Sequence, residues 1–239
     1  MAKRGGELDL WWHIGLATVG AGYRALLHCR YHGLDHLPRE GPALLASNHV
    51  SVLDPIAIAL GTASRGRALR FLTAADFFSH PVLGPGLRLL RQIPVRRGVR
   101  DLAALEELTR VLSSGGLAGI FPEGRVADRG ASGRLRGRSG MVRVARATGV
   151  PIVPVGIWGT QDRWSREHLE FSRPLRTPVM VAFGGPILID PDPHGAGDAG
   201  ETRRATARIM SAIQALSAKA RDAQRAERLR LLPPDGLPT

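Results

Sequence analysis

The chain has 239 residues, of which 44% are hydrophobic, and this suits one large globular domain with a sizeable core. A single cysteine, Cys29, excludes an intramolecular disulfide and a cysteine-based metal site, and fits a reducing cytosol. The net charge of +12 favours anionic partners. Aromatic residues make up only 5%, and no zinc-finger or RNA-recognition pattern occurs, so we expect a membrane surface or a phosphorylated substrate rather than nucleic acid.

The first long apolar segment covers residues 8–28. Four ionisable side chains interrupt it: Asp9, His13, Arg24 and His28. They exclude a clean transmembrane span and argue against a cleavable signal peptide. The pattern predicts an amphipathic helix, and the adjacent Trp11 and Trp12 suit a membrane interface, where an indole ring is half buried. The alternative is a helix that packs on the protein's own core.

Beyond residue 40, apolar strands and helical segments alternate along the chain. We expect strands near residues 43–47, 70–74, 117–121, 152–157 and 179–184. Helices are expected near residues 55–62, 101–113 and 139–148. This alternation predicts an α/β fold with a central, mostly parallel or mixed sheet flanked by helices.

The predicted organisation has four parts. Residues 1–30 form an N-terminal amphipathic, membrane-associating helix, and residues 31–200 form the α/β domain. Residues 201–232 form an amphipathic helix that packs on this domain, because apolar side chains recur at helical spacing while charges fill the other faces. Residues 233–239 are rich in proline and are expected to be an unstructured tail.

The stretch from Ala46 to Pro55 carries a histidine and an aspartate at the end of an apolar strand, a common place for functional side chains. In a continuous α-helix, His49 and Asp54 would lie about 140° apart around the axis and about 7.5 Å along it, so the chain must bend for them to meet. Pro55 favours such a bend and a helix that begins there, which makes Asp54 a candidate N-cap. Asp54 could cap the helix, orient His49, or do both.

A second polar site residue follows the strand at 117–121, within the sequence Phe121-Pro122-Glu123-Gly124-Arg125. If this strand runs parallel to the strand at 43–47, His49 and Glu123 leave the sheet at the same edge. Ligands of open α/β sheets bind at the carboxyl ends of the strands. We therefore expect His49 and Glu123 in one site.

Glycines and arginines alternate in the next segment, residues 124–140. They are Gly124, Gly130, Gly133, Gly137 and Gly140, with Arg125, Arg129, Arg134, Arg136 and Arg138. Backbone N–H groups at glycines and guanidinium groups both bind phosphate oxygens, so part of this loop is expected to contact phosphate or a membrane. A second basic cluster flanks residues 93–95 and could form the other side of an anion site: Arg88, Arg91, Arg96, Arg97 and Arg100. The alternative for both is a solvated basic surface.

Four short motifs occur in order along the chain. They are Asn48-His49-Val50-Ser51-Val52-Leu53-Asp54, Ile93-Pro94-Val95-Arg96-Arg97-Gly98, Phe121-Pro122-Glu123-Gly124 and Val150-Pro151-Ile152-Val153-Pro154-Val155. Together they resemble the four motifs of the membrane-associated glycerolipid acyltransferases, in particular the 1-acyl-sn-glycerol-3-phosphate (lysophosphatidic acid) acyltransferases. The resemblance extends over about residues 30 to 190 and places Arg97 at the arginine of the second motif.

The resemblance implies an acyltransferase domain that moves a fatty acyl group from an acyl-CoA or acyl-carrier-protein thioester to the free hydroxyl of a lysophospholipid. It makes His49 the general base and Asp54 the residue that orients the imidazole. It implies that substrates are bound by Asn48, Ser51, Arg97, Glu123, Gly124 and Arg125. No metal and no cofactor beyond the thioester co-substrate are expected. The expected location is an anionic phospholipid surface at the cytoplasmic face of the membrane, with peripheral or monotopic attachment.

Three departures from the family pattern concern the acceptor. Arg125 follows Gly124 directly where a threonine usually intervenes, Arg96 replaces a common acidic residue, and no lysine precedes Asp76-Phe77. The acceptor implied most directly is 1-acyl-glycerol-3-phosphate, which would give phosphatidic acid. The alternatives are lysophosphatidylinositol, a glycolipid or a lyso-ornithine lipid, or a non-catalytic peripheral protein that binds anionic lipid.

Overall fold

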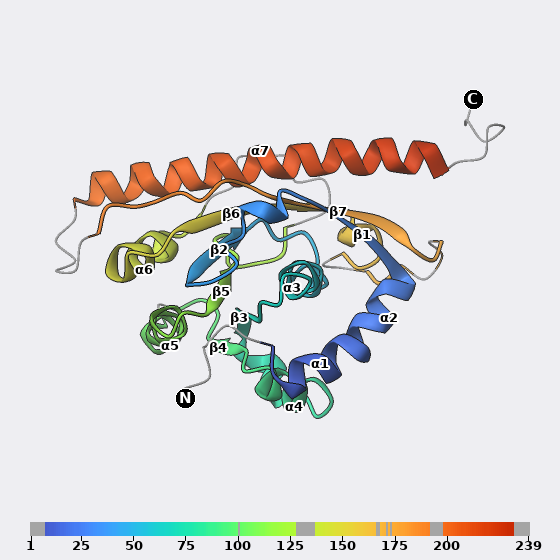
Figure 1. Ribbon diagram of the computed structural model, residues 1–239, viewed down its shortest axis with the longest axis horizontal. Helices are drawn as coiled ribbons and strands as arrows, with labels where there is room; N and C mark the ends of the chain where they lie inside the picture. Colours follow the sequence, from blue (N-terminus) through green and yellow to red (C-terminus); the bar gives the residue numbers. More distant parts are fainter. Residues whose placement is uncertain are drawn as a thin grey trace.

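The computed structural model describes residues 8–99, 101–127, 137–165, 168–170, 172, 174–191 and 198–231. Within these ranges a seven-stranded sheet lies between helices, the α/β fold that the sequence predicts (Figure 1). The strands are β1 (Leu27–His32), β2 (Ala43–Ser47), β3 (Leu69–Ala74), β4 (Ile93–Val95), β5 (Leu117–Ile120), β6 (Ile152–Trp158) and β7 (Thr177–Phe183). The α-helices are α1 (Leu10–Ala17), α2 (Val19–Leu26), α3 (Asp54–Ala63), α4 (Leu83–Leu89), α5 (Leu102–Ser113), α6 (Gly140–Thr148) and α7 (Ala199–Leu231). Short 3₁₀ helices are η1 (Leu34–His36), η2 (Ala75–Ser79) and η3 (Thr160–Asp162).

The strand order is β1-β7-β6-β2-β5-β3-β4, and all neighbours are parallel except β6 and β7. The strands from β6 to β4 in this order therefore point the same way. Because β6, β2 and β5 are adjacent, the loops that follow Trp158, Ser47 and Ile120 leave one edge of the sheet together. This edge carries the candidate site.

Strand β2 explains how the sheet is buried on both faces. Successive side chains of a strand point to opposite faces, so Leu44 and Ala46 belong to one hydrophobic cluster and Ala43 and Leu45 to another. The first cluster includes buried side chains of α5, α6 and α7, and the second includes those of α2 and α3. Figure 1 shows α7 stretched along one side of the sheet with α3 on the other. A strand covered on both faces reads as a continuous apolar run rather than an alternation.

The N-terminal segment differs from the single helix predicted over residues 8–28. Asp9 caps α1 by accepting from the backbone N–H of Trp12 at 3.1 Å, α1 ends at Ala17, and α2 begins at Val19. The helix then ends at Leu26, because the following residues form the edge strand β1, which pairs with β7. Strand β1 also crosses the predicted domain boundary at residue 30.

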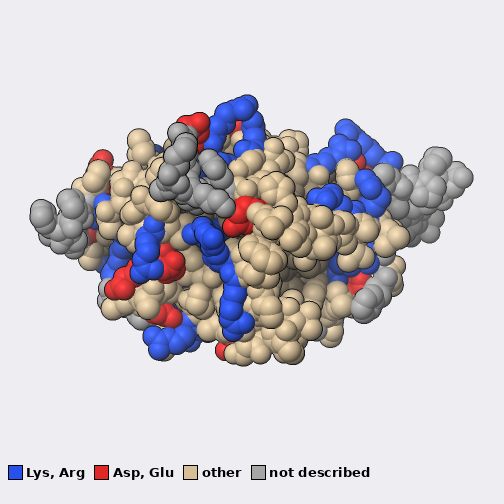
Figure 2. All heavy atoms as spheres, turned by 60° about the horizontal axis from the view of Figure 1, so that its bottom comes forward, with Lys and Arg blue, Asp and Glu red and all other residues tan. Residues whose placement is uncertain are grey.

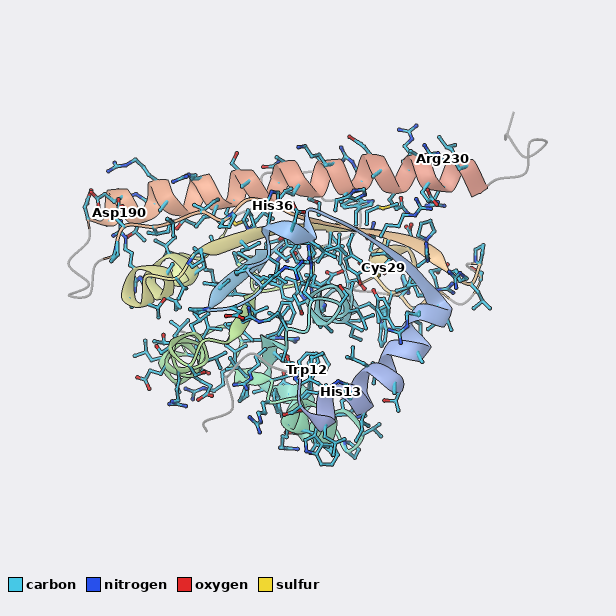
Figure 3. The ribbon with its side chains drawn as sticks, viewed as in Figure 1. Trp12, His13, Cys29, His36, Asp190 and Arg230 are labelled. Atoms are coloured by element: carbon cyan, nitrogen blue, oxygen red, sulfur yellow. The ribbon has the colours of Figure 1, made fainter. Side chains whose placement is uncertain are left out.

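The two adjacent tryptophans of α1 face opposite ways. Trp12 is buried and points to the interior of the molecule (Figure 3), whereas Trp11 is 44% exposed. Four further large apolar side chains of α1 and α2, those of Leu10, Ile14, Val19 and Leu26, are also exposed. Among the described helices, none combines the length and the apolar character that crossing a bilayer requires.

The other predicted strands and helices agree with the structure to within three residues at either end. The C-terminal helix α7 lies along β6 and β7, with Ile209, Met210 and Ile213 in the core cluster. Strand β4 was not predicted, because it has three residues, one of them proline. The predicted tail at 233–239 lies outside the described residues.

Candidate active site

His49 lies in the loop after β2, and the chain then turns so that Asp54, the first residue of α3, meets its ring. His49 Nδ1 lies 2.9 Å from Asp54 Oδ2. The side chain of Asp54 is fully buried and that of His49 is 15% exposed. An ionised carboxylate only accepts hydrogen bonds, so Nδ1 is the donor, and Nε2 of the neutral ring is the nitrogen able to take a proton. The bend that the spacing requires is therefore present.

Asp54 stabilises the turn before α3 rather than the first turn of the helix. Its Oδ2 also accepts from the backbone N–H groups of Val50 (2.7 Å) and Ser51 (2.8 Å). The cap position of α3 is Leu53, whose side chain makes no capping bond. The prediction that Asp54 is the N-cap is therefore wrong: its carboxylate accepts from residues before the helix, and these bonds curl the chain back towards His49.

The ring of Phe121, directly after β5, fixes the plane of the imidazole. Its centroid lies 3.9 Å from that of His49, with an interplanar angle of 12°. Phe71 of β3 stacks in turn on Phe121, with the ring centroids 5.1 Å apart and an interplanar angle of 6°. The three stacked rings hold the imidazole in the orientation in which Nδ1 reaches Asp54.

Glu123 joins His49 at the edge of the sheet, as the parallel-strand argument predicts. Its Oε1 accepts from the backbone N–H of His49 at 3.2 Å. Burial raises the pKa of Glu123, and the bond from the His49 N–H and the attraction of the imidazole only partly oppose this. The loop behind it lies along the same turn, because the backbone N–H of Ala127 donates to the His49 carbonyl at 2.7 Å.

Two predicted substrate-binding residues, Asn48 and Ser51, make hydrogen bonds within the protein. The amide of Asn48 is buried and bonds both ways to Ile157 of β6, donating to its carbonyl and accepting from its N–H, each at 2.9 Å. The hydroxyl of Ser51 is fully buried, donates to the Trp164 carbonyl at 2.5 Å and accepts from the Leu53 N–H at 3.1 Å. Both polar groups are engaged within the protein, so these contacts favour a structural role, and substrate binding by Asn48 and Ser51 stays a prediction.

The predicted arginines divide into those with internal partners and those at the edge of the site. Arg96 donates to Asp101, which caps α5, and these bonds hold the pKa of that carboxyl below its usual range. The guanidinium of Arg97 lies over the ring of Phe77, 5.6 Å from its centroid, beyond the end of β4. Arg125 is exposed and next to Gly124, within electrostatic range of Glu123.

Of the remaining arginines in the two clusters, three lie within the described residues: Arg88, Arg91 and Arg138. Arg88 donates to the Phe78 carbonyl and Arg91 pairs with Asp9 at 3.9 Å, so these two join neighbouring segments. Gly124 has a φ of +70°, and a Cβ there would lie 3.2 Å from the Nε of Arg138, so this guanidinium lies beside the turn. Residues Arg100, Arg129, Gly130, Gly133, Arg134 and Arg136 lie outside the described part of the chain.

Thr160 and Phe121 complete the site and were not predicted from the sequence. Thr160 begins η3 two residues after the end of β6, is fully buried, and donates to Asp54 Oδ1 at 2.5 Å. The available signal was positional: β6 pairs with β2 on the side opposite β5, so a polar residue just past its end belongs to the same edge. Stacking of Phe121 on His49 has no comparable signal, since an aromatic residue after a buried strand is ordinary.

The arrangement is suited to moving a proton. It offers a half-buried imidazole with one nitrogen bonded to a buried carboxylate, a second carboxyl beside its backbone, and arginines around the edge. Across the described ranges, no three His, Cys, Asp or Glu side chains come together as a metal site. The pair of His49 and Asp54 has the groups that general acid–base chemistry uses.

Comparison with known proteins points to one group. The family model "Acyltransferase" matches residues 28–158, more than half of the chain. An uncharacterized protein of Mycobacterium tuberculosis is 32% identical over 151 residues, covering 59% of this chain and 40% of that protein. The chloroplastic 1-acyl-sn-glycerol-3-phosphate acyltransferase of Arabidopsis thaliana is 31% identical over 131 residues, covering 54% and 35%. The lyso-ornithine lipid O-acyltransferase of Rhizobium meliloti is 30% identical over 133 residues, covering 55% and 42%.

A solved structure gives the same result for the fold. The 1-acyl-sn-glycerophosphate acyltransferase of Thermotoga maritima superposes with a TM-score of 0.57 and 23% sequence identity, covering 87% of this chain and 74% of that one. The matched region spans less than half of the length of the mycobacterial and plant relatives. All four motifs noted in the sequence lie within residues 28–158.

Proposed function

This chain belongs to the Acyltransferase family, and we propose that it transfers a fatty acyl group from an acyl thioester to the hydroxyl of a lysophospholipid. The observation that carries the proposal is the His49–Asp54 pair, with Nδ1 and Oδ2 at 2.9 Å, at the carboxyl edge of a parallel region of the sheet. An alcohol is a weak nucleophile at neutral pH. A positioned imidazole that removes its proton supplies what this reaction needs.

In the proposed reaction, Nε2 of His49 takes the proton of the acceptor hydroxyl while the hydroxyl oxygen attacks the thioester carbonyl carbon. The C–O ester bond forms, the C–S bond breaks, and the departing thiolate takes the proton from the imidazolium. Asp54 holds the ring in the required tautomer and stabilises the imidazolium while it carries the proton. General-base assistance of this kind contributes about 10²- to 10⁴-fold to the rate.

We propose 1-acyl-glycerol-3-phosphate as the acceptor and phosphatidic acid as the product. Arg97 and Arg125 follow β4 and β5, at the same edge as the dyad, and a guanidinium matches phosphate oxygens two at a time. Glu123, with its raised pKa, is available to hold a glycerol hydroxyl. A lyso-ornithine lipid is the second candidate, because a relative that bears this activity in its name is 30% identical over 133 residues of the chain.

We further propose that the protein works at an anionic membrane surface, attached peripherally at its cytoplasmic face. Helix α1 and the α4 region lie together, since a Cβ on Gly15 would contact the Leu90 side chain at 3.4 Å. Both present exposed apolar side chains, namely Leu10, Trp11 and Ile14 with Phe77, Val82, Leu83 and Leu89. The face that holds α1 and α4 comes forward in Figure 2, where a broad area carries no charged side chain and basic side chains lie beside it. Such a surface suits a bilayer that also holds the acceptor.

The experiment that tests the function is product analysis with the purified full-length protein. Palmitoyl-CoA and palmitoyl-acyl carrier protein are each offered with an equimolar mixture of lysophosphatidic acid, lysophosphatidylinositol, a lyso-glycolipid and a lyso-ornithine lipid, and the lipids are identified by mass spectrometry. Phosphatidic acid is the expected main product. Another acylated lipid would correct the acceptor. Vesicle binding without any acylated product from either donor would overturn the enzymatic proposal in favour of a lipid-binding protein.

A further inference from the structure

We propose that Thr160 is a positioning residue for the dyad, an inference that rests on the proposed function. Its hydroxyl would keep the Asp54 carboxylate turned so that Oδ2 faces His49. The structure carries this inference through one contact, from Thr160 Oγ1 to Asp54 Oδ1 at 2.5 Å. Both side chains are fully buried, so water does not compete for that oxygen.

The two carboxylate oxygens of Asp54 have unequal sets of partners. Oδ2 accepts from His49 Nδ1 and from the backbone N–H groups of Val50 and Ser51. Oδ1 faces the other way, and within the described residues its hydrogen-bond partner is Thr160. Rotation of the carboxylate about its Cβ–Cγ bond would break all four bonds at once. The Thr160 hydroxyl therefore fixes the end of the carboxylate that His49 and the backbone do not hold.

The backbone around Thr160 is built to place this hydroxyl. Gly159 has a φ of +109°, which other residues rarely adopt, and a Cβ there would lie 2.4 Å from the Pro178 carbonyl oxygen. Its N–H donates to Oε1 of Gln161 at 2.8 Å. This tight turn brings the chain from the end of β6 directly over the start of α3, where Asp54 lies.

Helix α7 holds the same turn from outside. Asp162, the last residue of η3, accepts at Oδ2 from Gln224 Nε2 at 2.9 Å and from Arg228 at 3.1 Å. Gln224 is buried and also donates to the Pro178 carbonyl, the group that faces Gly159. The C-terminal half of α7 is thereby connected to the dyad through η3, although in the sequence it lies far from the loop that carries His49.

Three variants of the full-length protein test the inference. Thr160→Val replaces the hydroxyl with a methyl group of similar size, and Thr160→Ser keeps the hydroxyl. Thr62→Val is the matched control: Thr62 is also fully buried and lies in α3, but its hydroxyl donates to the Ala59 carbonyl. Steady-state kinetics are measured for each variant, and urea unfolding shows what fraction of each is folded.

We expect Thr160→Val to lower kcat by about tenfold or more, which corresponds to a lost hydrogen bond to a charged group, with KM for the acceptor within about twofold. Thr160→Ser and Thr62→Val should keep kcat within about threefold of the wild type. Wild-type turnover by Thr160→Val, or equal impairment by Thr160→Ser, would overturn the inference. So would a loss of activity that only follows the unfolded fraction.

A second readout does not depend on turnover, so it separates this inference from the proposed function. The proton resonance of His49 Nδ1–H, identified by its absence in His49→Ala, reports the contact with Asp54 directly in NMR spectra. We expect it to shift or broaden in Thr160→Val and to stay unchanged in Thr160→Ser and Thr62→Val. An unchanged resonance in Thr160→Val would show that Asp54 keeps its orientation without Thr160. If the wild type lacks transferase activity, the proposed reaction is wrong. The NMR measurement still decides whether Thr160 orients Asp54 towards His49.

Discussion

The backbone N–H of His49 donates to Oε1 of Glu123 at 3.2 Å, joining residues that lie 74 positions apart. The bond connects the loops that follow β2 and β5, which are adjacent and parallel. His49 is thus held at two points, because Glu123 bonds to its backbone and Asp54 bonds to its ring. The position of the imidazole therefore depends on the sheet itself as well as on the local turn.

The raised pKa of Glu123 predicts how this residue affects stability with pH. The folded protein holds the proton more tightly than the unfolded chain, so the contribution of Glu123 to the free energy of unfolding falls as pH rises from 4.5 through the raised folded value. Glu123→Gln keeps an acceptor oxygen for His49 and removes the titration. We expect the free energy of unfolding of this variant, relative to the wild type, to increase over that pH range in urea titrations. A difference that does not change with pH would contradict this assignment.

The relation between His49 and Glu123 could be predicted because it follows from burial and direction. A continuous apolar run identifies β2 and β5 as buried strands, and two such strands joined by helical crossovers are parallel. The edge strands gave weaker signals. Residues 27–32 carry two histidines and an arginine, and they form β1 because β7 offers a free neighbouring edge. Pairing with a strand that is distant in the sequence leaves no pattern in the local sequence from which it could be predicted.

Asn48 is expected to contribute to stability rather than to substrate affinity. Asn48→Ala leaves the N–H and the carbonyl of Ile157 without their partner in the interior, a loss of about 1 to 3 kcal/mol in the free energy of unfolding. Urea unfolding measures this loss, and KM for the acceptor should stay within about twofold in the folded fraction. A large rise in KM without a loss of stability would instead show that Asn48 binds substrate.

The ring stack predicts a kinetic role for Phe121. Phe121→Leu keeps most of the apolar volume but removes the flat ring that contacts the imidazole. Aromatic contacts of this kind contribute about 0.5 to 1.5 kcal/mol, so we expect kcat to fall roughly two- to tenfold. Phe71→Leu is the control, because Phe71 stacks on Phe121 and is not the ring against His49. Equal effects of the two substitutions on kcat would argue against a specific role of the Phe121 ring.

Membrane attachment through α1 is testable with surface substitutions. Trp11→Ser with Ile14→Ser removes two apolar side chains that are 44% and 43% exposed, and so removes little from the core. We expect at least a tenfold loss of binding to anionic vesicles in a sedimentation assay, since each such side chain is worth about 1.5 to 3 kcal/mol when fully buried. The control is Leu175→Ser with Leu229→Ser, which removes two exposed leucines outside α1 and α4. Equal binding by both double variants would place the membrane contact elsewhere.

The site shows where sequence reasoning reaches its limit. His49 and Asp54 could be paired from the sequence, because their five-residue spacing and Pro55 require a bend. The other hydrogen-bond partners of the site's side chains depend on contacts that only the three-dimensional structure shows. The carboxylate of Asp54 turned back to Val50 and Ser51 instead of capping α3. The amide of Asn48, adjacent to the dyad in sequence, was directed into the sheet by the close approach of β6. Adjacency to a motif says little about which way a side chain points.

The most direct test of the central claim is the rate of acyl transfer by His49→Ala, measured as labelled lipid product per folded protein. The general-base role predicts a fall of at least about 10²-fold, with vesicle binding and the urea unfolding midpoint preserved. His32→Ala, which removes an exposed imidazole from β1, is the matched control and should keep the wild-type rate. Turnover by His49→Ala within a few-fold of the wild type would contradict the assignment of His49 as the base.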